Sequence, residues 1–230
     1  MEFVKVPRNL IYNVELGDKR VIAYLAVLFS DWNGKKVSDL TSYSLYSSFR
    51  GTNGVISNFK ALISNYLSVG LLIKTERGGF ITQSCDRFGM IYKSEFDRIL
   101  QHRKERVQAG KRVNHAHLLL LLAYIRSELH YAQGQPCFYS NLITRMSEVI
   151  GLSIRSISFG LKILEQLEII HSEELARYQT KDGAWHSNVR IMVNMKINGN
   201  EKYDWKDETK RAAFKIRSLS KQTEDKHNYG

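Results

Sequence analysis

The fold is decided by residues 151–170, which have the sequence GLSIRSISFGLKILEQLEII. A polar, glycine-containing turn comes first. Apolar side chains then recur every three or four residues, at Ile154, Ile157, Leu161, Leu164 and Leu167. That spacing places them on one face of an α-helix. Two isoleucines, at 169 and 170, then start an extended segment. We therefore predict a turn, a helix and a strand in direct succession.

The same pattern occurs 98 residues earlier in the chain. Seven apolar positions match at that offset: Ile56, Phe59, Ile63, Tyr66, Val69, Leu71 and Leu72 correspond to Ile154, Ile157, Leu161, Leu164, Leu167, Ile169 and Ile170. A helix over residues 55–67 is predicted on this basis, after a polar turn at residues 51–54. The two copies indicate a tandem repeat of one structural module.

Further elements flank the first copy. Apolar residues at helical spacing predict a helix over residues 18–30, with Asp18 as its N-cap. A short helix is predicted over residues 38–49. After the helix at 55–67, an extended run from Leu71 to Ile81 is interrupted by Gly78-Gly79, which predicts a hairpin.

The second copy has flanking elements in the same order. A strongly apolar helix is predicted over residues 116–131, and a hairpin is predicted from residues 171–178 and 184–195 around the turn at 181–183. Helix, helix, turn, helix and hairpin is the order of a winged helix-turn-helix module. The predicted fold class is therefore α+β, mainly α, with two winged helix-turn-helix modules in tandem joined by a basic helical linker.

Four segments follow from this organisation. An N-terminal winged helix covers residues 1–93, and a basic connecting segment covers residues 94–112. A C-terminal winged helix covers residues 113–197. A charged extension covers residues 198–230, with one predicted helix at 205–219.

The charge of the chain indicates its partner. The 230 residues contain 34 Lys and Arg against 23 Asp and Glu, which gives a formal net charge of +11 and favours a polyanion as the partner.

The longest apolar stretch, residues 118–124, is too short to cross a bilayer, and no export signal opens the chain. The two cysteines, Cys85 and Cys137, form no CxxC motif. We expect a soluble cytoplasmic protein with no membrane partner.

Two resemblances to known families extend this prediction. Residues 152–157, LSIRSI, together with Leu161 and residues 164–170, resemble the turn and recognition helix of winged-helix DNA-binding proteins, and residues 66–72 resemble the equivalent helix exit. Residues 3–11, FVKVPRNLI, followed by the helix from Val21 to Leu28, resemble the entry to the N-terminal winged helix of plasmid and phage replication initiators of Gram-positive bacteria. The resemblance implies sequence-specific binding of double-stranded DNA and initiation of plasmid or phage replication at origin repeats.

In a helix-turn-helix, the second helix lies in the major groove and reads base edges with its outward face. The outward positions of the second copy are Ser153, Arg155, Ser156, Ser158, Phe159 and Lys162. Those of the first copy are Asn53, Ser57, Asn58, Lys60, Ala61 and Ser64. Arg155 and Asn58 are the main candidates for base contacts, because Arg pairs bidentately with guanine and Asn with adenine. The alternative for each is a phosphate contact or a solvated helix face.

Cations outside these helices are candidate phosphate contacts. They are Lys74 and Arg77 in the first wing, Arg177 and Lys181 in the second, and Arg103, Lys104, Arg106, Lys111 and Arg112 in the connecting segment. Contacts of this kind make DNA affinity strongly salt-dependent. A solvated surface is the alternative for each of these residues.

Competing functions start from other features. His115-Ala116-His117 has the form that rolling-circle nickases use to bind a metal, but that motif requires a strand and residues 118–131 predict a helix. We therefore predict no catalytic residue, metal or cofactor. A transcriptional repressor that binds an operator is the alternative within DNA binding, and a metal-dependent nickase is the enzymatic one. Beyond double-stranded DNA, a homodimer and host replication proteins stay open as partners.

Overall fold

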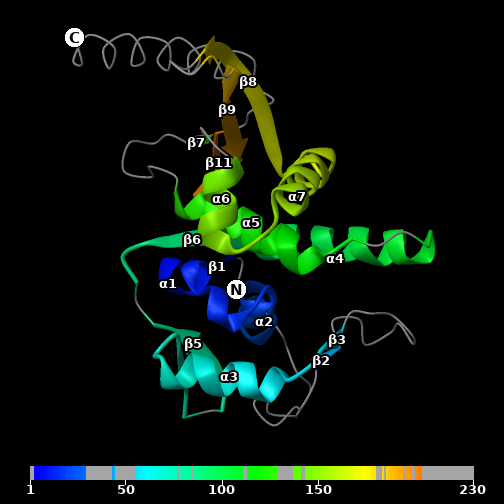
Figure 1. Cartoon of the computed structure of the whole chain (residues 1–230). Coiled ribbons are helices and arrows are strands. Elements are labelled where there is room, and N and C mark those ends of the chain that lie inside the picture. The colour runs from blue at the N-terminus through cyan, green and yellow to red at the C-terminus, as the bar shows by residue number, and fades with distance from the viewer. Residues whose placement is uncertain are drawn as a thin grey trace. The chain divides into compact units, whose positions relative to one another are not determined.

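The computed structural model describes residues 3–29, 43–44, 55–76, 78–83, 85–110, 113–128, 137–140, 143–179, 183, 185–193, 195–197 and 200–203. These residues form more helix than strand, with seven α-helices and several small antiparallel sheets among them (Figure 1). The mixed, mainly helical fold class predicted from the sequence is therefore confirmed. Contacts divide the chain into unit 1, residues 1–128 and 141–168, and unit 2, residues 129–140 and 169–230.

These units do not follow the boundaries of the four predicted segments. The helices of the second copy, α5 (His115–Ser127), α6 (Ile143–Ile150) and α7 (Ile154–Gln166), belong to unit 1 together with the N-terminal elements. The strands that follow α7 belong to unit 2.

Unit 1 begins with a strand and two helices. Strand β1 (Phe3–Pro7) leads into α1 (Arg8–Tyr12), a short 3-10 turn (Val14–Leu16) and α2 (Arg20–Phe29). The helix predicted over 18–30 is confirmed as α2, which is buried from Arg20 to Val27. Asp18 lies outside this helix, which begins at Arg20, and its carboxylate accepts hydrogen bonds from other side chains. The prediction of Asp18 as N-cap was therefore wrong.

A strand pair and two further helices enclose the centre of unit 1. Strand β1 pairs antiparallel with β6 (Phe88–Tyr92), from which α4 (Lys93–Gln108) continues directly. Strand β6 lies against α5 so closely that a Cβ built on Gly89 would lie 2.2 Å from the carbonyl oxygen of Ala123. Within α5, every residue from Leu118 to Arg126 is buried. This buried, mainly apolar helix therefore forms the core of unit 1.

The first copy of the repeat agrees with the structure only in part. Helix α3 (Phe59–Ser68) begins later than predicted, because β3 (Val55–Ile56) pairs with β2 (Tyr43–Ser44) and Asn58 adopts a left-handed conformation with φ 57°. The helix predicted over 38–49 is contradicted at residues 43–44, which form a strand. The other residues of that predicted helix, and the predicted turn at 51–54, lie outside the described residues. The predicted hairpin is confirmed as β4 (Leu72–Lys74) paired with β5 (Phe80–Thr82).

The described residues of unit 2 form two small sheets. Strands β7 (Cys137–Ser140), β8 (Ile170–Gln179) and β9 (Trp185–Val193) form an antiparallel sheet in the order β7-β9-β8. Strands β10 (Met195–Ile197) and β11 (Asn200–Tyr203) form a second pair. The hairpin predicted after the second helix is confirmed as β8 and β9, whereas β7 was not predicted. The helix predicted at 205–219 lies outside the described residues.

The 98-residue repeat is visible in the backbone where α3 and α7 end. Val69 and Leu167 donate backbone hydrogen bonds to Asn65 and Ile163, respectively. Next comes a left-handed residue in each copy: Gly70 with φ 71° and Glu168 with φ 52°. Non-glycine residues rarely adopt this conformation. The two helix exits therefore share one geometry as well as one apolar pattern.

Candidate nucleic-acid interface

Helices α6 and α7 are joined by the short turn at residues 151–153. A glycine in the left-handed conformation, Gly151 with φ 73°, ends α6, and its amide donates to the Ser147 carbonyl. The Ser147 hydroxyl also donates to the carbonyl of Leu152, at 2.6 Å. The Ser153 hydroxyl then caps α7 by accepting from the Ser156 amide at 3.1 Å. Each step of the turn is thus held by a local hydrogen bond.

One face of α7 is buried in unit 1. Ile157, Ile163 and Leu164 are buried, and Gly160 brings the helix onto α5, where a Cβ would lie 3.1 Å from Leu121. The Arg98 guanidinium of α4 also donates to the carbonyl of Leu167 at 2.9 Å. These contacts fix both the rotation of α7 about its axis and the position of its C-terminal end.

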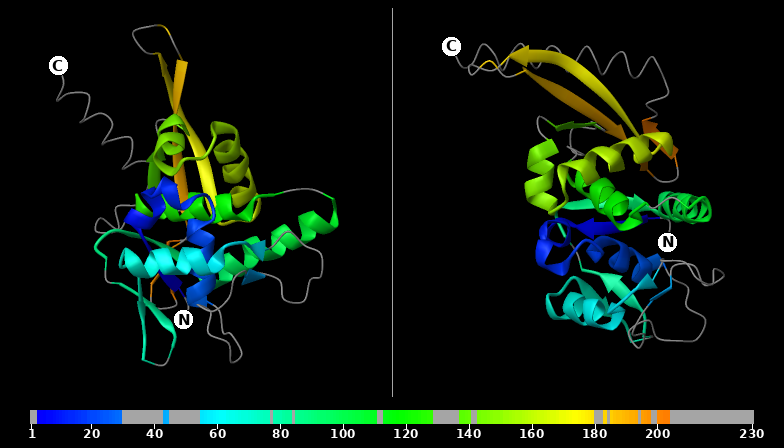
Figure 2. Two further views of the ribbon diagram at one scale, coloured as in Figure 1. Left: turned by 60° about the horizontal axis from the view of Figure 1, so that its bottom comes forward. Right: turned by 45° about the vertical axis from the view of Figure 1, so that its right-hand side comes forward.

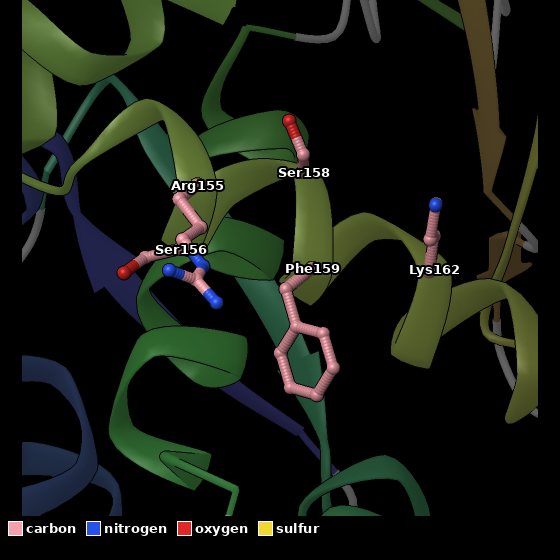
Figure 3. A pocket seen from close by; sticks show the side chains of 5 residues that line it. All are labelled: Arg155, Ser156, Ser158, Phe159 and Lys162. Carbon is pink, nitrogen blue, oxygen red and sulfur yellow. The ribbon is translucent and has the colours of Figure 1, made fainter.

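The opposite face of α7 is accessible. Arg155, Phe159 and Lys162 are exposed, and Ser156 and Ser158 are half-buried. Together these five side chains line an open depression of about 470 Å³. In Figure 3, Arg155 and Phe159 lie one helical turn apart on one side of the exposed face of α7, and Ser158 and Lys162 lie on the other side. We call this exposed set of side chains the α7 row. The predicted outward positions of the second copy therefore lie together, apart from Ser153, which is the helix cap.

Phe159 is the most unusual member of this row. Phe159 is 44% exposed. Large aromatic residues are usually mostly buried. Arg155 stands on one side and Lys162 one turn further along. A planar apolar group between two cations suits a partner that combines negative charge with flat or methyl-bearing apolar groups.

The candidates in the first copy form a separate group. Ser57, Asn58, Lys60 and Ser64 are all exposed, as predicted for an outward face, but Ser57 and Asn58 precede α3 instead of lying within it. Lys74 is exposed on β4. Helix α3 and the β4–β5 hairpin lie at the opposite end of unit 1 from α6 and α7 (Figure 2). The two candidate helices therefore do not form one continuous surface.

The cations of the connecting segment have unequal surroundings. A helix, α4, covers most of the segment predicted to connect the two copies, and Lys104 and Arg106 are half-buried on it. Arg103 is buried, with 7% of its surface exposed. The side chain of Arg177 lies in the part of β8 that is described only as backbone. The remaining predicted contacts lie outside the described residues: Asn53, Arg77, Lys111, Arg112 and Lys181.

The His115-Ala116-His117 motif opens helix α5, as the helical prediction requires. His117 lies 3.0 Å from the Asp18 carboxylate, and this hydrogen bond lowers the pKa of Asp18 to about 2. His115 is buried, and burial lowers its pKa to about 4. Over the described part of the chain, no group of three His, Cys, Asp or Glu side chains could bind a metal ion.

Sequence reasoning missed a buried arginine that holds the end of α6. Arg20 is 1% exposed, and its guanidinium donates to the carbonyls of Leu10, Ile11, Gly17 and Ile150. The last of these, at 2.8 Å, is the final residue of α6. Arg20 therefore ties the end of α6 to the N-terminal segment. The available signal was a charged residue at the start of an otherwise apolar helix.

No protein-family model matches this chain, and neither a curated protein nor a solved structure does. Among the described residues, no helix is long and apolar enough to cross a membrane.

Proposed function

We propose that this protein binds double-stranded DNA in a sequence-specific manner, with α7 in the major groove. The observation that carries this proposal is the row of Arg155, Ser158, Phe159 and Lys162 on the free face of a capped helix that follows a short, glycine-containing turn. The major groove admits an α-helix and presents a distinct pattern of donors, acceptors and methyl groups for each base pair.

The residues of this row have complementary roles in such a complex. Arg155 lies in the first turn of α7 and is suited to a bidentate contact with guanine. Phe159, one turn further, offers an apolar surface for a thymine methyl group. Lys162 is suited to a phosphate of the backbone. Direct base contacts would therefore come from the N-terminal half of the helix.

Element order supports the winged-helix form of this proposal. Helix α5, strand β7, helices α6 and α7, and strands β8 and β9 follow one another along the chain, and the sheet order is β7-β9-β8. A short strand after the first helix that joins the later hairpin is typical of winged helices. The net charge of +11 favours the same polyanionic partner.

For the biological role, we propose initiation of plasmid or phage DNA replication at repeated origin sites. The support is the resemblance of residues 3–11 to the entry of replication initiators and the repeat at a 98-residue offset, whose two helix exits share one backbone geometry. Two unlike reading helices on one chain suit asymmetric or iterated sites.

Selection of bound sequences from a random duplex library, with the purified full chain, tests both levels of the proposal. Direct repeats among the selected sequences support the initiator role. Palindromic half-sites support an operator-binding regulator instead. Enrichment of no sequence contradicts sequence-specific binding.

A substitution tests the role of Arg155 in base recognition. Arg155→Ala should weaken binding to the selected site by roughly 10-fold to 100-fold, because a bidentate base contact is worth about 1–3 kcal/mol. Binding to random duplex should change much less. Fluorescence anisotropy at fixed salt measures both affinities. Arg87→Ala, at an exposed arginine outside the α7 row, is the matched control and should change neither. Equal losses on both duplexes would make Arg155 a phosphate contact.

A further inference from the structure

The buried face of α4 ends in Arg103, which has two buried nitrogen atoms without a hydrogen-bond partner. Phe96, Ile99 and Leu100 are buried at helical spacing, and Arg103 continues the same face with 7% of its surface exposed. Its Nε and Nη1 atoms are buried and have no hydrogen-bond partner. An unpaired buried guanidinium is unfavourable, because it has lost water without gaining an acceptor. Arg20, which is also buried, donates instead to backbone carbonyls.

Other unpartnered nitrogen atoms lie around Arg103. Helix α4 packs against α5, whose first residue, His115, is 8% exposed and has a buried Nδ1 without a partner. The positive charge of Arg103 also contributes to the low pKa of His115. One turn along α4, the Nε atom of Arg106 is also buried and unpartnered, as is Nδ1 of His102.

Two carboxylates near this cluster, among the described residues, already accept hydrogen bonds. Asp18, whose charge acts on His115, accepts hydrogen bonds from Asn114 at 3.2 Å and His117 at 3.0 Å. Glu105, whose charge acts on His102, accepts from Gln101 at 2.9 Å. Lys19 adds a further positive charge near His115. Positive charge and unused donors therefore accumulate between α4 and the start of α5.

We propose that Arg103, Arg106, His115 and the N-terminal end of α5 bind the phosphate group of an anionic ligand. A guanidinium fork matches the oxygen atoms of a phosphate, and the positive end of a 13-residue helix favours an anion. A neutral histidine can donate one N–H to the same group. This site lies apart from the α7 row and does not depend on the proposed function of that row.

The phosphate can come from two sources, free inorganic phosphate or the DNA backbone. The first arm of the test measures thermal unfolding of the full chain in inorganic phosphate and in chloride at equal ionic strength. At a tenfold excess over the dissociation constant, phosphate should raise Tm by roughly 3–5 °C relative to chloride.

Variants at Arg103 decide whether the buried cation is responsible. Arg103→Met should abolish the phosphate-induced shift and leave Tm in chloride unchanged or higher, because an unpaired charge has been replaced by an apolar side chain of similar length. Arg87→Met should retain the full shift. If Arg103→Met fails to fold, Arg106→Met replaces it and should reduce the phosphate affinity at least about tenfold.

The second arm measures binding of a random-sequence duplex by the wild type and by Arg103→Met. A backbone phosphate as the ligand predicts at least a roughly fivefold loss of duplex affinity for the variant and no response of the wild type to millimolar phosphate. Free phosphate as the ligand predicts the Tm shift and unchanged duplex affinity. The proposal is overturned if neither the phosphate response nor duplex binding depends on Arg103 or Arg106. Loss of sequence selectivity in Arg155→Ala bears only on the α7 row.

Discussion

At the scale of single residues, three buried arginines show how the same side chain serves different ends. Arg20 saturates its guanidinium with backbone carbonyls and joins segments that are 130 residues apart. Arg126 forms a bidentate pair with Glu95, at 2.5 and 2.6 Å, and also donates to the Met90 carbonyl. Arg103 alone of these three has buried donors without acceptors. The first two therefore hold the fold, and the third has capacity left for a ligand.

His115 should make the stability of the protein depend on pH. Burial lowers its pKa to about 4, below the value of about 6.5 expected in the unfolded chain. The unfolded chain therefore binds this proton more tightly, and stability falls as pH decreases from about 6.5 toward 4. Between pH 7 and pH 5 we expect a loss of about 2 kcal/mol, measured by urea unfolding in phosphate-free buffer.

His115→Gln is the variant that checks the source of this pH dependence. It should lose most of the change between pH 7 and pH 5. The titration of Asp18 does not interfere, because its pKa is lowered to about 2 and the stability that it contributes is lost only as pH falls below about 4. A wild type and variant with the same pH profile would show that His115 is not the titrating group.

At the scale of elements, close packing of helices and strands depends on residues without side chains. Gly89 allows β6 to contact α5, and Gly160 allows α7 to approach Leu121 and Leu118 of the same helix. Helix α5 is therefore approached closely at two points, by β6 and by α7. This arrangement positions α7 so that its row of exposed residues faces away from the core.

Gly89→Ala should destabilise unit 1 by about 1–3 kcal/mol. The added Cβ would meet the Ala123 carbonyl at 2.2 Å, and a backbone atom cannot move aside as a flexible side chain does. Chemical unfolding of the full chain measures the effect. Gly79→Ala, where the nearest atom is 3.4 Å away in an exposed turn, is the control and should change stability by less than about 0.5 kcal/mol. Equal stabilities of the two variants would contradict the close contact between β6 and α5.

At the scale of the whole molecule, the second copy of the repeat is not a self-contained body. Its helices share unit 1 with the N-terminal elements. Arg20 bonds the end of α6, and Val14 lies 2.2 Å from where a Cβ of Gly151 would be. The turn between α6 and α7 is therefore packed against residues of the N-terminal segment.

A fragment of residues 113–230 should not unfold cooperatively by itself. It lacks β6, α2 and Arg20, so the buried face of α5 would be exposed to water. Circular dichroism during urea titration should show a broad, shallow transition, and addition of a 1–112 fragment should sharpen it. A cooperative transition of the isolated fragment, unchanged by its complement, would show that the second copy folds independently.

The sequence by itself determined the elements whose signals are local. Apolar spacing located α2, α4, α5 and α7, glycine turns located both hairpins, and the outward face of α7 followed from its period. Each of these depends on residues within one or two turns of each other. The shared exits of α3 and α7 were likewise implied by the matching apolar positions.

Only the tertiary structure decided how distant segments meet. Strand β7 and the late start of α3 depend on pairing with strands elsewhere in the chain, and the burial of Arg20 depends on a carbonyl 130 residues away. Asp18 pairs with His117 instead of capping α2. From the sequence, Arg103 was predicted to be a surface cation, whereas in the structure it is buried. Burial and long-range pairing are set by packing across the whole unit, which no local pattern records.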